Sequence, residues 1–395
     1  MKILIYGDNF NDNSGFGKEL KNLIPTFLEA GHEVAQVALN YSGLPPREYK
    51  IKMYPTKILG VRSYWAAEVL DFAIDDFRPD IVFSVGDYFM LPHIVTIMTK
   101  PRDVRWIHWG VIDGDPMRKE YMVASSWANW NLVQSKYGAK ILKETQKKVY
   151  GKTQAEVFYP PIDLEVFKPL NKELLRTKYK TDERFTVLFV GRNQYRKNTP
   201  VLLEAISKLK TVITNIQLLI HSTPTVSPNG TPDGFDLLNI VEEMDLKEYV
   251  ASVKSPNALP EEVMAEIYNS ADCLCLPSFG EGFGLPIAEA MACGTPVIGN
   301  KCSSITELLE KDRGMLVSPS AHVWQDGFTK HQVLNSDNLA NAIKRVWENP
   351  VLRSTYIDNG KEFVKTLESR LRGEELLKIF EKVLKENPDP LAKQE

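Results

Sequence analysis

The chain has 395 residues, more than a single hydrophobic core usually serves, so two domains are expected. Its apolar content of 43% and charged content of 25% are ordinary for a globular protein. A formal net charge of -3 lacks the basic footprint of nucleic-acid-binding proteins, and we expect no nucleic-acid partner.

The first apolar run, Lys2–Gly7, is too short for a signal peptide. No stretch reaches the roughly 18 consecutive apolar residues that a membrane span needs. We therefore expect a cytoplasmic protein, or one that is attached peripherally at the inner face of a membrane.

Short apolar runs then alternate with helical segments along most of the chain. Because the runs are apolar throughout, they predict parallel strands that are covered on both faces by helices. The expected strands are Lys2–Gly7, Glu33–Leu39, Asp80–Val85, Val104–Trp109, Asn131–Gln134, Ala155–Tyr159, Phe185–Val190, Ile216–His221, Tyr249–Val253, Cys273–Pro277, Pro296–Gly299 and Met315–Val317.

The alternation restarts after Tyr159–Pro169, whose prolines suit an extended connector. We expect an N-terminal Rossmann-like domain at 1–165 and a second one at 170–365. A C-terminal helix and tail at 366–395 could pack back on the first domain. Residues 318–335 are expected to form a long loop, a kind of segment that is often functional.

Two doubly wound domains place ligands at the carboxyl ends of their strands. The four cysteines (Cys273, Cys275, Cys293 and Cys302) show no metal-ligand spacing, so we interpret them as reduced structural thiols. We expect neither a metal site nor a bound cofactor.

The most informative segment is Pro277–Pro296, in which a strand ends, a glycine-rich turn follows and a helix begins near Leu285. Gly280, Gly282 and Gly284 leave backbone N–H groups open to close approach by a ligand. Together with the helix N-terminus, these groups would suit a phosphate or sugar hydroxyls.

Glu289 lies about one turn into this helix, among apolar neighbours. An unpaired carboxylate is expensive to bury, so we interpret Glu289 as facing a polar ligand such as a ribose diol. The alternative is a glutamate that is satisfied by its own helix N-terminus.

Glu281 and Glu289, with seven residues between them, resemble the signature of the family 4 retaining glycosyltransferases of GT-B fold. That fold is α/β, with two Rossmann-like doubly wound parallel-sheet domains facing a central cleft and with C-terminal helices. The resemblance implies that Glu289 holds the ribose and that Glu281 lies beside the transferred sugar. It also implies that sugar hydroxyls and phosphate meet the backbone amides of Gly282, Phe283, Gly284 and Leu285.

A second match is Val190–Pro200, in which the resemblance implies that Arg192 and Lys197 hold the donor diphosphate. Such cations supply the charge that a departing nucleoside diphosphate requires. The family usually has glycine after this lysine, whereas Asn198 stands here. Taken alone, two basic residues at a turn are more often solvated.

Weaker matches lie in the first half. Gly15 and Gly17 resemble the family's N-terminal glycine loop, although any tight turn can look like this. His108 stands where family members often place a histidine that reaches the donor sugar; the alternative is a histidine packed between tryptophans. Asp113 and Asp115 are candidates for orienting the acceptor hydroxyl.

The resemblance implies transfer of a hexose from a nucleoside-diphosphate sugar (UDP- or GDP-sugar) to an acceptor hydroxyl on a glycan or lipid-linked acceptor. The anomeric configuration would be retained without a metal. The lysine-rich segment Lys136–Lys152 could also make weak peripheral contact with an anionic membrane, although a solvated helix face is the more common explanation of such a pattern.

Other functions remain open at this stage. A sugar-nucleotide epimerase of the same fold would need no acceptor. A dehydrogenase would need a Gly-x-Gly-x-x-Gly unit, which neither domain spells cleanly. A non-catalytic carbohydrate-binding protein would be expected to lack Glu289 or the Arg192–Lys197 pair, and all three residues are present.

Overall fold

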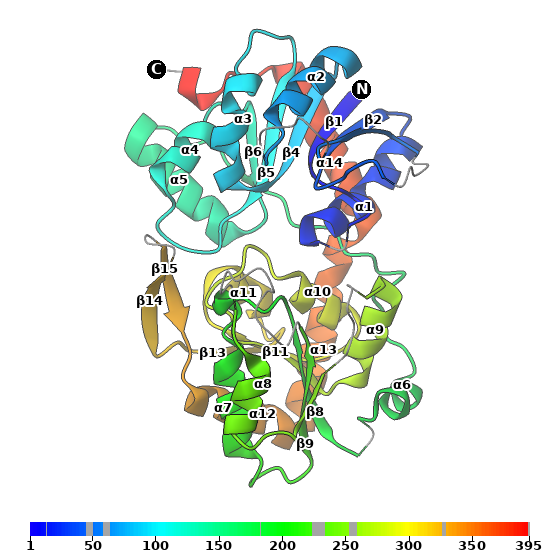
Figure 1. The fold of residues 1–395 in the computed structure, drawn as a ribbon, viewed down its shortest axis with the longest axis vertical. Coiled ribbons are helices and arrows are strands. Elements are labelled where there is room, and N and C mark those ends of the chain that lie inside the picture. The colour runs from blue at the N-terminus through cyan, green and yellow to red at the C-terminus, as the bar shows by residue number, and fades with distance from the viewer. Residues whose placement is uncertain are drawn as a thin grey trace. The chain divides into compact units, whose positions relative to one another are not determined.

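The computed structural model describes residues 1–12, 14–44, 50–57, 64–181, 183–222, 234–252, 259–325 and 329–393. The chain divides into two compact units: Met1–Pro161 with Leu367–Glu395, and Ile162–Thr366. Each unit contains one parallel sheet with helices packed on it (Figure 1). The expected α/β class, with two doubly wound sheets, is confirmed.

The sheet of the first unit has the strand order β3-β2-β1-β4-β5-β6-β7, and every pairing is parallel. The interior strand β1 is apolar on both faces, and its residues Ile3 to Tyr6 are fully buried. The strands are β1 (Lys2–Asp8), β2 (Glu33–Leu39), β3 (Lys52–Pro55), β4 (Ile81–Asp87), β5 (Arg105–Val111), β6 (Trp130–Val133) and β7 (Glu156–Val157).

Helices cover the two faces of this sheet. One apolar cluster joins Ile3 and Ile5 to α1 and α14, and another joins Leu4 and Tyr6 to residues of α2, α3, α4 and α5. The helices are α1 (Gly15–Glu29), α2 (Ala67–Phe77), η1 (Tyr88–Met90), α3 (Leu91–Met98), α4 (Lys119–Ser125), α5 (Lys136–Tyr150), α14 (Ser369–Glu386) and η4 (Leu391–Lys393).

The C-terminal helix α14 belongs to the core of the first unit (Figure 1). The ring of Phe380 lies 5.9 Å from Phe27 of α1 and 5.1 Å from Phe83 of β4. At Gly373 an added Cβ would lie 2.7 Å from Thr26, so α1 and α14 cross too closely there for any side chain. The last helix therefore completes a core that begins with the first strand.

The sheet of the second unit has the order β10-β9-β8-β11-β12-β13, again parallel throughout. Its strands are β8 (Phe185–Val190), β9 (Ile216–His221), β10 (Val250–Ser252), β11 (Cys273–Leu276), β12 (Val297–Asn300) and β13 (Met315–Val317). Its helices are α6 (Lys172–Tyr179), η2 (Tyr195–Lys197), α7 (Thr199–Leu209), α8 (Leu237–Glu243), α9 (Glu261–Ser270), α10 (Leu285–Ala292), α11 (Ser303–Leu309), α12 (Ser336–Glu348), α13 (Pro350–Val364) and η3 (Lys365–Leu367).

The expected long loop at 318–335 is wrong for its described residues. Ala321–Gln325 (β14) and Thr329–Val333 (β15) pair as an antiparallel hairpin. Asn300 fixes the base of this hairpin, because its Nδ2 donates to the carbonyls of Gln332 at 2.9 Å and Ser278 at 3.0 Å. The hairpin is therefore tied to the segment that follows β11.

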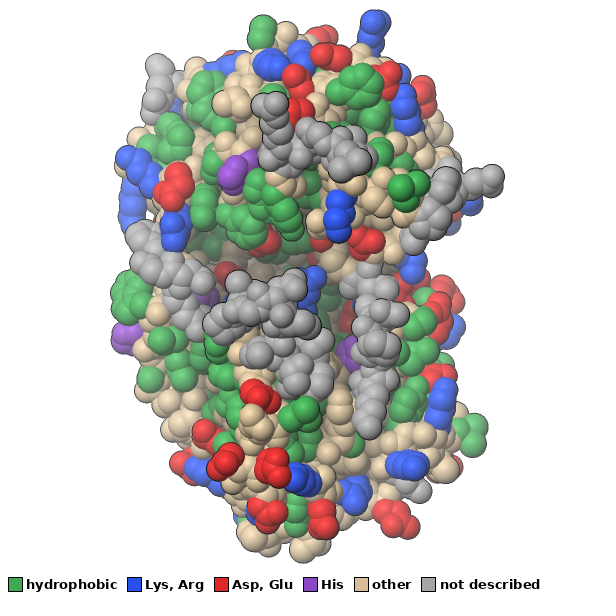
Figure 2. Space-filling view, viewed as in Figure 1, with side chains coloured by type: hydrophobic (Ala, Val, Ile, Leu, Met, Phe, Trp, Pro, Cys, Tyr) green, Lys and Arg blue, Asp and Glu red, His purple; other side chains and the backbone are tan. Residues whose placement is uncertain are grey.

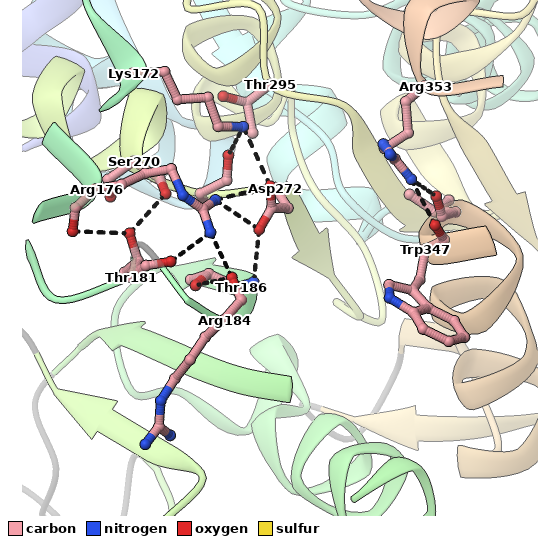
Figure 3. Close-up of polar contacts among 12 residues, drawn as sticks. Lys172, Arg176, Thr181, Arg184, Thr186, Ser270, Asp272, Thr295, Trp347 and Arg353 are labelled. Atoms are coloured by element: carbon pink, nitrogen blue, oxygen red, sulfur yellow. Dashed lines mark hydrogen bonds and ion pairs between the residues drawn. The ribbon is translucent and has the colours of Figure 1, made fainter. Parts of the chain in front are cut away.

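A network of partly buried ion pairs and hydrogen bonds fixes α6 to the sheet of the second unit (Figure 3). Arg176 of α6 donates from Nη1 to both carboxylate oxygens of Asp272, each at 2.9 Å. Asp272 also accepts from the backbone N–H of Thr186 on β8 at 2.9 Å and pairs with Lys172 at 3.3 Å. One carboxylate thus joins a helix, a strand and the start of β11.

Charged side chains of both signs are interspersed over the described part of the face that Figure 2 shows. This mixture matches a chain with 48 basic and 51 acidic residues. No helix among the described residues is long and apolar enough to cross a membrane.

We predict that Phe380→Ala lowers the free energy of unfolding by about 3–5 kcal/mol, because it leaves a cavity between α14, α1 and β4. Leu371→Ala, on the same helix but 54% exposed, is the matched control and should change stability by less than about 1 kcal/mol. Chemical denaturation of both variants measures the difference. Equal effects would contradict a core role for α14.

Candidate functional site

The glycine-rich loop between β11 and α10 carries the principal candidate site. Gly284 precedes α10 with φ +102°, a conformation that L side chains rarely adopt, and its added Cβ would lie 3.2 Å from Ile287. The loop is held by α11: Ser303 Oγ accepts from Glu281 N at 2.8 Å, and Ser304 Oγ shares its proton between the carbonyls of Glu281 and Phe283. The loop backbone is therefore preorganised before any ligand arrives.

Glu281 is a buried carboxylate between two cations. Its Oε1 lies 2.6 Å from Lys197 Nζ, and its Oε2 lies 2.9 Å from Arg196 Nη1. Burial alone would raise the pKa of Glu281, but the charges of Lys197 and Arg196 outweigh burial and lower it to about 2. Glu281 is consequently ionised throughout the neutral range.

Lys197 reaches Glu281 from the segment after β8. It ends the short helix η2, and its stem packs against Gly191, where β8 has just ended. Asn198 follows with φ +51°, a left-handed conformation that glycine adopts freely and asparagine tolerates. Asparagine at this position is therefore compatible with the turn that the chain makes here.

The structure distinguishes the basic residues of this turn. Arg192 is exposed and lies outside the ion pairs of Glu281, whereas Arg196 takes part in them. Sequence reasoning did not single out Arg196, because a spacing pattern does not show which of two nearby arginines points inward. The assignment of Arg192 to the diphosphate stays a prediction.

Glu289 lies on the first helical turns of α10 and is 5% exposed. Its Oε2 accepts a hydrogen bond from the hydroxyl of Tyr268 on α9 at 2.6 Å. Burial, together with the nearby carboxylate, raises the pKa of Tyr268. The sequence analysis did not identify Tyr268 as a partner of Glu289. Its hydrogen bond offsets part of the free energy that burial of the Glu289 carboxylate costs. A ribose-binding role for Glu289 stays a prediction.

In the first unit, Gly15 and Gly17 open α1 after β1. Ser14 caps the helix, because its Oγ accepts from Gly17 N at 3.0 Å. An added Cβ at Gly17 would lie 2.5 Å from the carbonyl oxygen of Asp12, so only glycine fits there.

His108 on β5 is fully buried. Its Nδ1 lies 3.0 Å from Ser84 Oγ, which also accepts from Trp106 Nε1 at 2.8 Å. Whether Nδ1 or the Ser84 hydroxyl donates depends on which imidazole nitrogen carries the proton. Burial lowers the pKa of His108 to about 3, although a hydrogen bond with the backbone of Ser84 opposes this, and the ring is neutral at pH 7.

Asp113 and Asp115 follow the carboxyl end of β5. Asp113 is half-buried, whereas Asp115 is exposed. Their proposed action on an acceptor hydroxyl stays a prediction.

The four cysteines are buried and reduced, and burial raises the pKa of Cys273, Cys275 and Cys293. Across the described ranges, His, Cys, Asp and Glu side chains form no cluster that could hold a metal ion.

Comparisons with known proteins agree with this architecture. Residues 171–363 match the family described as glycosyl transferases group 1. A D-inositol 3-phosphate glycosyltransferase of Mycobacterium sp. (strain KMS) is 33% identical over 147 residues, which are 37% of this chain and 31% of that protein. The matched segment thus spans less than a third of this relative.

Solved structures match over nearly the whole chain. Sucrose-phosphate synthase from Thermosynechococcus elongatus has a TM-score of 0.78 at 19% identity, covering 97% of this chain and 99% of the other. Anabaena HepE, solved in complex with UDP-glucose, has a TM-score of 0.73 at 16% identity, covering 97% and 100%. Residues 171–363 are thus similar to the group 1 glycosyl transferases, and the fold of the chain is GT-B.

Proposed function

We propose that this protein transfers a hexose from a nucleoside-diphosphate sugar to an acceptor hydroxyl on a glycan or lipid-linked acceptor, with retention of configuration and without a metal. The observation that carries the proposal is the buried Glu281 carboxylate, which two cations hold beside a glycine loop and a helix N-terminus. The solved structure of HepE with UDP-glucose supports a UDP-sugar as donor, and a GDP-sugar is the other candidate.

The donor diphosphate would lie between Arg192, Lys197 and the amides of Gly282, Phe283, Gly284 and Leu285. Glu289, already held by Tyr268, would accept from the ribose hydroxyls. Cations and oriented N–H groups stabilise the charge that develops on a departing diphosphate. They would do here what a metal ion does in other transferases.

Glu281 would orient the sugar and take no covalent part. A retaining double displacement needs a carboxylate that attacks the anomeric carbon. Glu281 shares its charge with Lys197 and Arg196, which weakens it as a nucleophile and leaves it a hydrogen-bond acceptor. We therefore favour front-face attack, in which the leaving phosphate accepts the proton of the acceptor hydroxyl.

His108 would donate from Nε2 to the donor sugar. The buried Nε2 of the structure has no hydrogen-bond partner, and Gly110 leaves the space beside it free of a side chain. Asp113 and Asp115 would orient the acceptor, and the backbone at Gly15 and Gly17 would lie near the acceptor and the phosphate of the nucleotide sugar.

A weak membrane contact through α5 would suit a lipid-linked acceptor. The buried face of α5 packs through Gly138, Ala139, Ile141, Leu142 and Gln146. Its exposed residues include Lys136, Lys140, Lys143, Lys147 and Lys148. Such a face attracts anionic lipid headgroups, with about 1 kcal/mol per lysine.

The first prediction concerns the nucleotide. One of UDP, GDP and ADP should bind wild type with micromolar affinity, and Glu289→Gln should weaken that binding at least about tenfold by losing a charged acceptor for the ribose. Glu262→Gln, an exposed neighbour on α9, is the control. Isothermal titration measures both. A folded wild type that binds none of the three would favour a non-catalytic protein.

Incubation with the matching nucleotide sugar separates the remaining alternative. Release of free diphosphate that depends on an acceptor indicates a transferase. Release without any acceptor, accompanied by an epimerised sugar, would favour the epimerase.

The second prediction concerns His108. In the proposed tautomer the hydroxyl of Ser84 donates to Nδ1 and the proton stands on Nε2. Ser84→Ala would remove that hydroxyl, so the imidazole should lose its single tautomer and kcat/KM should fall about tenfold. Affinity for the free diphosphate should not change. Nitrogen NMR of the ligand-free wild type should find the proton on Nε2, and a proton on Nδ1 would exclude the proposed donor role.

The third prediction concerns α5. Lys143→Gln/Lys147→Gln should weaken binding to phosphatidylserine-containing vesicles by about 2 kcal/mol at low salt. Lys378→Gln/Lys385→Gln, two exposed lysines of α14, is the matched control. Vesicle co-sedimentation at two salt concentrations reports both, and equal losses in the two variants would reject a specific role for α5.

A further inference from the structure

Arg196 and Lys197 contact Glu281 in different ways, although they are adjacent in the sequence. Each oxygen of the carboxylate has its own cation, Lys197 on Oε1 and Arg196 on Oε2. The side chain of Glu281 is only 6% exposed and that of Lys197 10%, whereas that of Arg196 is 28% exposed. The carboxylate is thus paired twice in a nearly dry position.

Arg196 is additionally fastened to the loop that carries Glu281. Its Nη1 donates to the carbonyl of Gly280 at 2.5 Å, and its own carbonyl accepts from Phe279 N at 2.8 Å. One side chain and one peptide group of Arg196 therefore hold three consecutive residues, from Phe279 to Glu281. A planar guanidinium can make such contacts at once because its donors are fixed in a fork.

The side chain of Lys197, unlike that of Arg196, can change its partner. Its ammonium group is a compact charge on a flexible stem, and that stem passes over Gly191 at the carboxyl end of β8. An ammonium on such a stem can turn from a carboxylate to a phosphate without moving the backbone. If the Lys197 ammonium moved to a phosphate, the buried Glu281 carboxylate would keep the ion pair with Arg196. Without Arg196 that carboxylate would then be buried with no cation from this pair, which is costly.

We propose that Arg196 is a positioning residue, which keeps Glu281 ionised and aimed at the donor sugar when Lys197 turns to the diphosphate. The inference rests on the proposed function, in which Lys197 binds the donor. It assigns Arg196 to the glutamate loop and Arg192 to the phosphates. Two nearby arginines of one turn thereby have separate roles.

Other groups around Glu281 do not replace this charge. The charged groups that face its carboxylate in the described structure are Lys197 and Arg196, and Ser278 faces it as a hydroxyl. Ser303 and Ser304 contact the backbone of Glu281 and carry no charge. Among the described residues, loss of Arg196 therefore leaves Lys197 as the remaining cation on that carboxylate.

The ligand-free protein offers the first test. The pKa of Glu281 in the folded chain, about 2, lies below its ordinary value of 4.5, so pairing stabilises the fold above that value and is lost as the pH falls toward 2. Arg196→Gln should lower the denaturation midpoint at pH 7, and the difference from wild type should shrink between about pH 5 and pH 2. A difference that is the same at every pH overturns the inference.

The second test separates positioning from phosphate binding. Arg196→Gln should leave the Kd of the bound diphosphate (UDP, GDP or ADP) within about twofold, lower kcat at least about tenfold and raise the acidic pKa of the kcat profile. Arg192→Gln should instead raise that Kd. Arg196→Lys, which keeps one charge, should recover part of kcat and carries the test if the glutamine variant does not fold.

Equal weakening of diphosphate binding by Arg192→Gln and Arg196→Gln would overturn the inference, because Arg196 would then be a phosphate ligand. If wild type binds no diphosphate at all, the proposed function fails, yet the pH dependence of stability still decides whether Arg196 holds Glu281.

Discussion

The second unit is organised around a charge that is buried before any ligand is present. Glu281 is ionised because Lys197 and Arg196 supply more favourable interaction than desolvation removes. A buried ion pair of this kind adds little to stability compared with apolar packing, and losing either partner is costly. Such an arrangement is expected where the charge serves binding, since a core built for stability alone would use apolar side chains.

Strand order explains how these residues meet. Lys197 and Glu281 are far apart in the sequence, but they follow β8 and β11, which are hydrogen-bonded neighbours in a parallel sheet. The carboxyl ends of parallel strands lie at one edge, so the loops after adjacent strands are brought together. β12 and its following helix α11 then supply Asn300 and Ser303, which fix the loop from its other side. The site is thus a consequence of the crossover connections around β8, β11 and β12.

Sequence patterns predicted the two sheets well, because buried parallel strands are apolar on both faces and stand out from their surroundings. They missed β3, a short edge strand with Lys52 and Pro55, and the β14–β15 hairpin, whose polar residues resemble a loop. Side-chain partners were harder still. Tyr268 donates to Glu289, and Arg196 rather than Arg192 pairs with Glu281. Both contacts depend on the direction in which the side chains point, and the spacing of residues in a single sequence does not contain that direction.

In the first unit, the register of two paired strands fixes the position of a buried polar group, the imidazole of His108. Ser84 and His108 stand opposite each other in the register of β4 and β5, so the sheet itself fixes the hydrogen bond between them. Trp106 Nε1 donates to the same hydroxyl and holds the serine in place from a second direction. Burial keeps the histidine neutral, whereas the cations of the second unit keep Glu281 charged. A neutral imidazole can donate a hydrogen bond and an ionised carboxylate can accept one, so each unit holds one of the two kinds of group that a hydroxyl can pair with.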